Sequence, residues 1–331
     1  MKKVSIYELK SLYRDDMKIY GWKFGSGEKS AVIAGGIRGN EIQQMFTCAR
    51  LIKSLKEIEK EGKISDGKSI LVVPVINPCS MNIEKRFWPT DNTDINRMFP
   101  DYNLGETTLR IASGVFSEIS GYKYGIQFAS NYILGEFVPH VRIMTTGYED
   151  VESAKSFGFP YIVLRKPHPY DTTTLHYNWQ IWETKSYSIF TNQTETIDQK
   201  GADYAVQHVL NFLNEKQILK FSAHKGYISS IIDESMMICV KSKAAGIFQK
   251  FTEPYQSVKK GQVLACILSP TDCIIMEEIK SPVDGTIFFT QIKSLAYANA
   301  VLFKIIPDAQ YFFFRAPRGC PKSKIHSVIS K

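Results

Sequence analysis

The sequence has no apolar run long enough to cross a membrane, since no stretch approaches the roughly 18 uncharged residues that a spanning helix needs. Its beginning, MKKVSIYELKSLYRDD, also lacks the apolar core of a signal peptide. We therefore expect a cytoplasmic protein with no membrane partner.

Cysteine is scarce as well, and no two cysteines form a CxxC pair. This spacing excludes a disulfide framework and a zinc site built from cysteine pairs. Free thiols are usually buried in a protein core. We expect this for all six cysteines, which are Cys48, Cys79, Cys239, Cys266, Cys273 and Cys320.

The net charge of +8 raises the question of a nucleic-acid partner. The segment after Asp308, however, carries five basic residues and no acidic one, so the rest of the chain is nearly balanced. No nucleic-acid recognition motif accompanies the basic residues. We therefore expect a solvated basic tail at 309–331 and no nucleic-acid partner.

The 331 residues, 44% of them hydrophobic, can form two domains with ordinary cores. In the first part, strand-like and helix-like segments alternate, which favours a sheet flanked by helices. The expected strands are 17–24, 30–37, 69–76, 124–130, 141–147, 161–166 and 186–191, and the expected helices are 40–58, 106–120 and 199–214. Asn40 and Gln43 have the spacing of a capping box at the start of the first helix.

The second part contains an internal repeat, because 244–268 and 281–305 share a small turn, a strand, a loop and a closing strand. Two such halves can cover each other's apolar faces in a flattened barrel. The repeat resembles lipoyl and biotinyl carrier domains, but its connecting hairpin, 269–275, lacks their modified lysine. We therefore expect a structural or oligomerising barrel and a possible homo-oligomer.

These patterns predict an α/β fold with a mixed, mostly parallel sheet flanked by helices, followed by an all-β barrel-sandwich. The expected divisions are an α/β domain at 1–217, the barrel at 225–308 and the tail at 309–331.

Four short motifs carry candidate chemistry. GGIRGNE (35–41) is a glycine-rich turn between a strand and a helix, NP (77–78) precedes TDINRMFP (93–100), and PHVR is found at 139–142. Asn96 and Arg97 follow a buried strand, where ligands bind in open α/β sheets. A guanidinium there has the planar geometry that suits a carboxylate.

Together, GxxGNE, NP, DxNRxFP and PHxR ahead of a barrel resemble the succinylglutamate desuccinylase/aspartoacylase family over residues 15–310. The resemblance implies a hydrolase, a deacylase of N-acyl amino acids related in fold to M14 carboxypeptidases. It implies one zinc ion held by two histidines and a glutamate, a catalytic glutamate that activates water, and arginines that bind the substrate carboxylate. Arg38, Asn96, Arg97 and Arg142 are the substrate-binding candidates.

Several of the implied zinc and catalytic positions carry other residues. Arg38 and Ala129 stand where the family has its two histidine ligands, and Glu41 is the one matching ligand. Gln193 stands at the catalytic glutamate, with Glu195 two residues later as a possible substitute. Because a catalytic zinc usually has three protein ligands, zinc binding here is doubtful.

Other roles remain open for these residues. Arg38 could pair with Glu41 and replace the charge of the metal, or Glu41 could simply stabilise a helix start. Arg97 could form an ion pair with Asp94 or Asp91 instead of binding a ligand. His140, His168 and His176 could help to rebuild a metal site.

The sequence therefore leaves three functions open. The chain could hydrolyse an N-acyl amino acid through a remodelled site, or bind such a carboxylate without catalysis, or serve as a structural protein.

Overall fold

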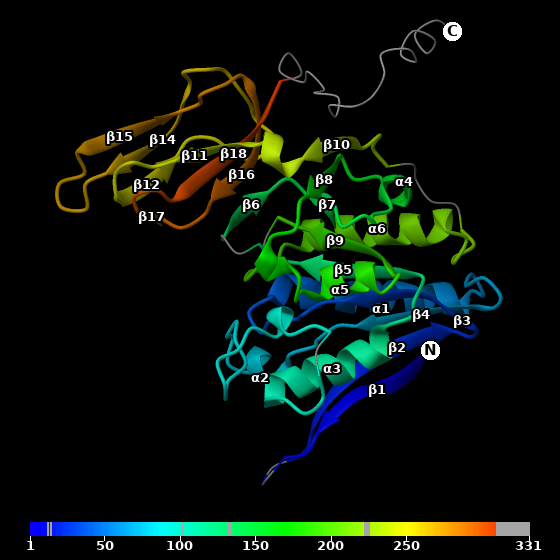
Figure 1. Cartoon of the computed structure of the whole chain (residues 1–331). Helices are drawn as coiled ribbons and strands as arrows, with labels where there is room; N and C mark the ends of the chain where they lie inside the picture. The colour runs from blue at the N-terminus through cyan, green and yellow to red at the C-terminus, as the bar shows by residue number, and fades with distance from the viewer. Residues whose placement is uncertain are drawn as a thin grey trace, which may run out of the picture.

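The computed structural model describes residues 1–11, 13, 15–100, 102–131, 134–192, 194–221 and 226–308. The predicted basic tail at 309–331 lies outside these residues. Figure 1 shows an α/β region with one large sheet, and a smaller group of antiparallel strands to its upper left.

The α/β region is built on a nine-stranded sheet in the order β1-β2-β4-β3-β5-β9-β7-β8-β10. Parallel pairs join β4, β3, β5 and β9, and also β7, β8 and β10. Antiparallel pairs attach β1 and β2 and join β7 to β9. The strands are β1 (Lys2–Leu9), β2 (Met17–Gly25), β3 (Glu28–Ala34), β4 (Lys68–Val73), β5 (Tyr124–Ala129), β7 (His140–Met144), β8 (Tyr161–Arg165), β9 (Lys185–Phe190) and β10 (Ser230–Asp233). The predicted mixed, mostly parallel sheet is confirmed.

Helices cover both faces of this sheet. They are α1 (Ile42–Lys60), α2 (Pro78–Met81), α3 (Thr107–Ile119), α4 (Val151–Ala154), α5 (Leu175–Ile181) and α6 (Gln199–Glu215). Ile33 of β3 packs in one core cluster with side chains of α1 and α6. Its neighbour Val32 packs on the other face with α3 and α5. This alternation follows from the two-residue period of a strand.

The predicted capping box at the start of α1 is wrong. Helix α1 begins at Ile42, with Glu41 in the cap position and no side-chain cap. The side chain of Asn40 donates a hydrogen bond to Glu195 instead. Gln43 exchanges two hydrogen bonds with the backbone of Asp198, which lies 155 residues away. The side chains of Asn40 and Gln43 thus form hydrogen bonds with residues distant in sequence instead of capping the helix.

The C-terminal strands form two facing antiparallel sheets. Their strands are β11 (Ile238–Lys241), β12 (Gly246–Lys250), β13 (Ser257–Val258), β14 (Val263–Leu268), β15 (Ile275–Lys280), β16 (Gly285–Gln291), β17 (Leu295–Ala296) and β18 (Val301–Pro307). Gly246 and Gly285 have matching surroundings, because a Cβ on either would lie 2.3 Å from the carbonyl oxygen of Leu268 or Ile306. Equivalent close approaches in the two halves bear out the internal repeat.

The two parts of the molecule are joined through strand pairing. The short strand β6 (Gly135–Phe137), from the α/β half of the sequence, adds to β16 of the barrel. Strand β10 pairs with β8 in the large sheet just before the first barrel strand. The predicted boundaries, with the α/β domain ending at 217 and the barrel beginning at 225, remain a prediction.

Two further predictions from the sequence have mixed outcomes. Cys48 and Cys266 are buried, whereas Cys239 and Cys273 are exposed. The prediction that all the cysteines are buried is therefore wrong. Cys320 lies outside the described residues. Among the helices that the structure describes, none has the length and apolar character to span a membrane.

Candidate functional site

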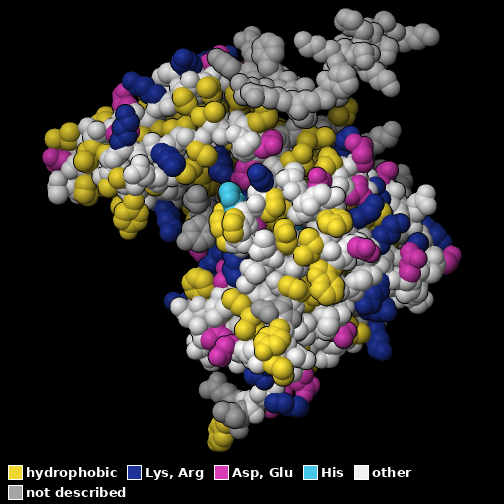
Figure 2. Space-filling model, in the orientation of Figure 1, with side chains coloured by type: hydrophobic (Ala, Val, Ile, Leu, Met, Phe, Trp, Pro, Cys, Tyr) yellow, Lys and Arg dark blue, Asp and Glu magenta, His cyan; other side chains and the backbone are white. Residues whose placement is uncertain are grey.

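A cavity of about 530 Å³ lies where the large sheet meets the barrel. In Figure 2 the surface is notched between these two parts, and dark-blue side chains lie along both sides of the notch. Among the side chains that line the cavity, two are acidic, Asp171 and Glu234. Six are basic: Arg38, Arg86, Arg97, Arg142, Arg165 and Lys304. Such an excess of positive charge in a partly closed site favours an anionic ligand.

The floor of the cavity is a row of polar residues across three neighbouring strands. Gln127 of β5 is the register partner of Ser188 of β9, and Ser188 is the partner of Arg142 of β7. All three line the cavity and are buried. The side-chain oxygen Oε1 of Gln127 is buried without a hydrogen-bond partner among the described residues. An unpaired buried acceptor is costly, so this oxygen is suited to accept a hydrogen bond from a ligand.

His176 fixes the orientation of the Ser188 hydroxyl. Its Nε2 accepts the backbone N–H of Met144 at 3.4 Å, so Nδ1 carries the proton and donates to Ser188 Oγ at 2.7 Å. Burial, together with the charge on Arg142, lowers the pKa of His176 to about 3, so the ring is neutral at pH 7. Ser188 therefore has no general base here, and its hydroxyl proton is free to point toward the cavity.

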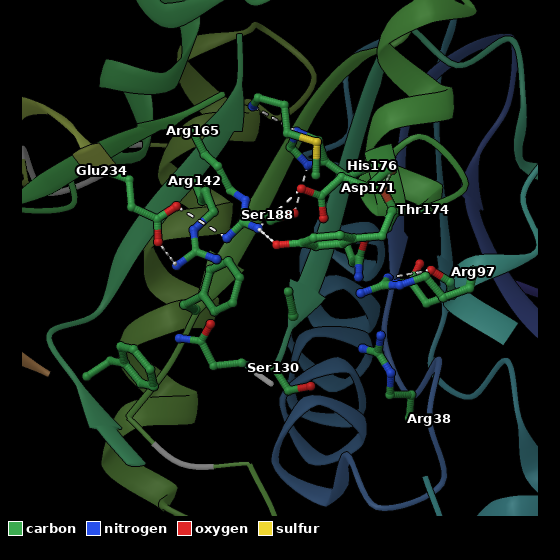
Figure 3. Close-up of a pocket in the computed structure, with 18 of the residues that line it drawn as sticks. Arg38, Arg97, Ser130, Arg142, Arg165, Asp171, Thr174, His176, Ser188 and Glu234 are labelled. Carbon is green, nitrogen blue, oxygen red and sulfur yellow. Dashed lines mark hydrogen bonds and ion pairs between the residues drawn. The ribbon is translucent and has the colours of Figure 1, made fainter. Parts of the chain in front are cut away.

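One end of the cavity is organised around Glu234, which directly follows β10. Its carboxylate lies 3.2 Å from Arg165 of β8, 3.8 Å from Arg142 and 3.0 Å from Lys304 of the barrel strand β18. Figure 3 shows Arg142 and Arg165 projecting beside Glu234 on one side of the cavity. Burial raises the pKa of Glu234, but the three cations outweigh it and bring the pKa to about 2.

The opposite end is organised around Arg38, in the glycine-rich turn before α1. Its Nη1 donates to Glu41 Oε1 at 3.1 Å, and its Nε lies 3.0 Å from both carboxylate oxygens of Asp94. Asp94 also accepts from Arg86 at 3.0 Å. The predicted Arg38–Glu41 pair is thus present, and the two side chains are almost fully buried.

The glycine-rich turn is held in place by close packing against the segment after β4. A Cβ on Gly39 would lie 2.1 Å from the backbone carbonyl carbon of Ser80. Gly36 has a φ of 49°, a backbone conformation that glycine adopts without strain. These two constraints explain why the turn that presents Arg38 is rich in glycine.

Arg97 and Asn96 lie in a short 3-10 turn, at the same end of the cavity as Arg38. Arg97 donates to the backbone carbonyl of Asn96 at 2.8 Å, and its guanidinium lies 5.9 Å from the ring centroid of Tyr170. Within the described part of the chain it forms no ion pair, so the alternative pairing with Asp94 or Asp91 is not made. Asn96 uses its side-chain oxygen to accept the Leu175 N–H.

The pKa values separate the five arginines of the cavity into two classes. Arg38 and Arg165 have raised pKa values, because neighbouring carboxylates outweigh the effect of burial. Arg86, Arg97 and Arg142 have lowered pKa values, chiefly because of burial; Arg38 lowers the pKa of the first two further and Arg165 that of Arg142, while nearby carboxylates offset part of the effect. The surroundings of Arg97 and Arg142 therefore leave part of their charge uncompensated.

Arg142 is further marked by an unsatisfied donor. Its Nε is buried without a hydrogen-bond partner among the described residues, and its guanidinium lies 4.1 Å from the ring centroid of Phe190. In Figure 3, Arg97 and Arg142 lie on opposite sides of the cavity. One incompletely compensated guanidinium at each end suits a ligand with two anionic groups.

The residues present do not fit the zinc site that the resemblance implies. No group of three or more His, Cys, Asp or Glu side chains in the described ranges is placed to hold an ion. The carboxylate of Glu41 already accepts hydrogen bonds from Arg38, from the Ser130 hydroxyl and from the backbone N–H groups of Ile37 and Arg38. Ala129 lines the cavity at the end of β5 with a methyl group only.

The remaining predicted residues lie elsewhere or are not described. Glu195 lines a neighbouring cleft rather than the cavity, and its side chain accepts from Asn40 at 2.9 Å. Gln193 lies outside the described residues. His140 is buried under Phe190, with a ring-centroid distance of 4.9 Å, and does not line the cavity. His168 stacks on Tyr170 and does not line the cavity.

Some residues of the site were not predicted from the sequence. Gln127, Ser188, Arg165, Glu234 and Lys304 line the cavity but were not among the candidate site residues. The available signal was the polar Gln127 inside the otherwise apolar strand YGIQFA; Ser188 had no such signal, since Lys185 and Ser186 of the same strand are polar too.

Comparison with known proteins finds a family resemblance over part of the chain and a shared fold. Residues 28–126 match the family model described as the succinylglutamate desuccinylase/aspartoacylase catalytic domain. An N-alpha-acetyl-L-2,4-diaminobutyric acid deacetylase from Halomonas elongata is 26% identical over 155 residues. That match spans 43% of this chain and 41% of the deacetylase, which is less than half of the curated relative.

Two solved structures share the fold over nearly the whole chain. The succinylglutamate desuccinylase/aspartoacylase from Rhodobacter sphaeroides has a TM-score of 0.75 at 16% identity, covering 92% of this chain and 95% of its own. The product-bound ectoine utilization protein EutE (DoeB) from Ruegeria pomeroyi has a TM-score of 0.70 at 18% identity, covering 88% and 89%. The family model bears out the resemblance over residues 28–126, and the two structures confirm the expected fold.

Proposed function

We propose that this chain, in which residues 28–126 match the succinylglutamate desuccinylase/aspartoacylase catalytic domain, binds a small N-acyl amino acid in the cavity. The ligand carries two carboxylates, one on each side of its amide bond. A volume of about 530 Å³ is within the range of small-molecule sites.

The observation that carries this proposal is the pair of incompletely compensated guanidinium groups. Arg97 and Arg142 both lie against an aromatic ring, which limits their freedom before a ligand arrives. A carboxylate at each would accept hydrogen bonds and supply the missing negative charge. Preorganised, partly buried donors bind planar carboxylates more strongly than exposed, mobile ones.

The polar row between the two ends is suited to an amide. Gln127 Oε1 can accept the amide N–H, and the Ser188 hydroxyl can donate to the amide carbonyl. These groups carry no charge, so they would select a neutral linkage between the anionic groups. This arrangement supports an N-acylated amino acid over a simple dicarboxylic acid.

Amide hydrolysis is the second candidate, and the similarity to a deacetylase over 155 residues favours it. The described side chains of the cavity include no evident activator of water. Asp171 accepts from Arg165, and Glu234 lies among three cations. Glu195 would have to act from the adjoining cleft, which shares Arg86, Ser130 and Asn131 with the cavity. Binding without hydrolysis is therefore the primary proposal.

Isothermal titration with N-acetyl and N-succinyl amino acids tests the proposal. We expect the N-succinyl compounds, which carry a carboxylate on each side of the amide, to bind best, and the N-acetyl compounds, which lack the acyl carboxylate, to bind more weakly. Arg97→Ala and Arg142→Ala should each weaken binding at least tenfold, which corresponds to about 1.4 kcal/mol. Arg50→Ala, which removes an exposed arginine paired with Asp203, is the matched control and should bind as the wild type does.

Release of free amino acid from the same compounds tests the hydrolytic alternative. Turnover by the wild type would establish hydrolysis. Failure of all the acylated amino acids to bind would exclude both functions for this cavity.

A further inference from the structure

We infer that the guanidinium of Arg38 is a built-in cation in the place of the family's metal ion, so that the cavity binds its ligand without a metal. The identity of the ligand rests on the proposed binding function. The placement of Arg38 rests on its contacts with Glu41 and Asp94 alone.

The first argument is the occupancy of Glu41. Its Oε1 accepts from Arg38 Nη1 and from the Ser130 hydroxyl, and its Oε2 accepts from two backbone N–H groups at 3.1 and 3.2 Å. Glu41 is fully buried. A metal ion could bind this carboxylate only by displacing Arg38 from it.

The second argument is the way Arg38 is held. Glu41 engages Nη1 and Asp94 engages Nε, so two carboxylates on different segments fix the plane of the guanidinium. A guanidinium stays protonated throughout the physiological pH range, so this cation is permanent, whereas a bound metal would depend on its supply.

The third argument concerns the side of the guanidinium that remains available. Arg38 lines the cavity, and its Nη2 makes no hydrogen bond to any side chain or backbone group in the described ranges. Arg38 can thus donate to an oxygen of the ligand. A guanidinium supplies charge and hydrogen bonds but, unlike zinc, does not coordinate water and lower its pKa.

An engineered metal site tests the position of Arg38. In Arg38→His/Ala129→His, two histidines and Glu41 would provide the three protein ligands of a typical catalytic zinc site. We expect about one zinc ion per chain after chelator treatment and zinc titration, and its loss when Glu41→Gln is added. The matched control is Arg50→His/Ala129→His, which has the same composition but places one histidine on the exposed surface of α1.

Zinc content, measured by elemental analysis on folded protein, decides the outcome. Zinc in the double variant but not in the control or the wild type supports the inference. About one zinc per chain in the wild type, or equal zinc in the double variant and its control, overturns it.

A second measurement needs no variant. Ligand affinity of the wild type should change less than twofold when EDTA is present, and loss of binding in EDTA would overturn the inference. If no acylated amino acid binds but the zinc results are as expected, the proposed function fails and the placement of Arg38 stands.

Discussion

Removal of the Arg38 side chain is the most informative perturbation of stability. In Arg38→Ala, Glu41 keeps the Ser130 hydroxyl and two backbone donors but loses its counter-charge. Breaking a buried ion pair from one side typically costs about 3–5 kcal/mol, because the remaining charge is left uncompensated. Asp94 keeps Arg86 at 3.0 Å, so the loss is dominated by Glu41.

A loss of that size should be evident in thermal unfolding. We expect the melting temperature at pH 7 to fall by roughly 5–15 °C, since a loss of 1 kcal/mol typically lowers it by a few degrees. Arg50→Ala is the control, because its exposed pair with Asp203 should contribute no more than about 1 kcal/mol.

A double-mutant cycle with Glu41→Gln separates the pair from other effects of Arg38. If Glu41 is the reason for the loss, Arg38→Ala/Glu41→Gln should be more stable than the sum of the single changes predicts, by roughly 1–3 kcal/mol. Strictly additive single effects, or an Arg38→Ala protein as stable as Arg50→Ala, would refute the reasoning.

Three further changes follow from the same structure. Gly39→Ala should cost more than about 2 kcal/mol in thermal unfolding, because its Cβ would meet backbone at 2.1 Å; wild-type stability would contradict the packing described. Burial, together with the charge on Arg142, lowers the pKa of His140 and His176 to about 3. Both histidines therefore stay neutral in the folded protein, and their contribution to the free energy of unfolding is complete above about pH 6.5. Below that pH the unfolded chain takes up protons that the folded chain does not, so the free energy of unfolding falls by about 1.4 kcal/mol per histidine for each pH unit. Calorimetry between pH 7 and 5.5 should show this fall, and a flat profile would exclude it. Glu234→Gln should tighten binding of a dicarboxylate roughly fivefold in calorimetric titrations, because it removes a competing negative charge; weaker binding would mean that Glu234 instead positions the cations.

Much of the architecture could be predicted because it depends on local periodicity. Continuous apolar runs such as 69–76 gave buried strands, and the three- to four-residue repeat after position 40 gave α1. The Arg38–Glu41 pair could also be predicted from the sequence, since residues three apart around a turn can face one another.

The rest of the site depends on chain segments that are distant in sequence. Glu234 reaches the cavity because β10 pairs with β8, and Lys304 reaches it from the barrel. No spacing in the sequence reports that Gln127 and Ser188 are register partners. Asn40 and Gln43 failed as a capping box for the same reason, because partners more than 150 residues away took their hydrogen bonds.

A structure of the protein with an N-succinyl amino acid bound tests the central claim most directly. We predict one carboxylate within hydrogen-bond distance of Arg142, the other at Arg97 and Arg38, and the amide opposite Gln127 and Ser188. A ligand in the adjoining cleft beside Glu195, or a metal ion on Glu41 with Arg38 displaced, would contradict the account.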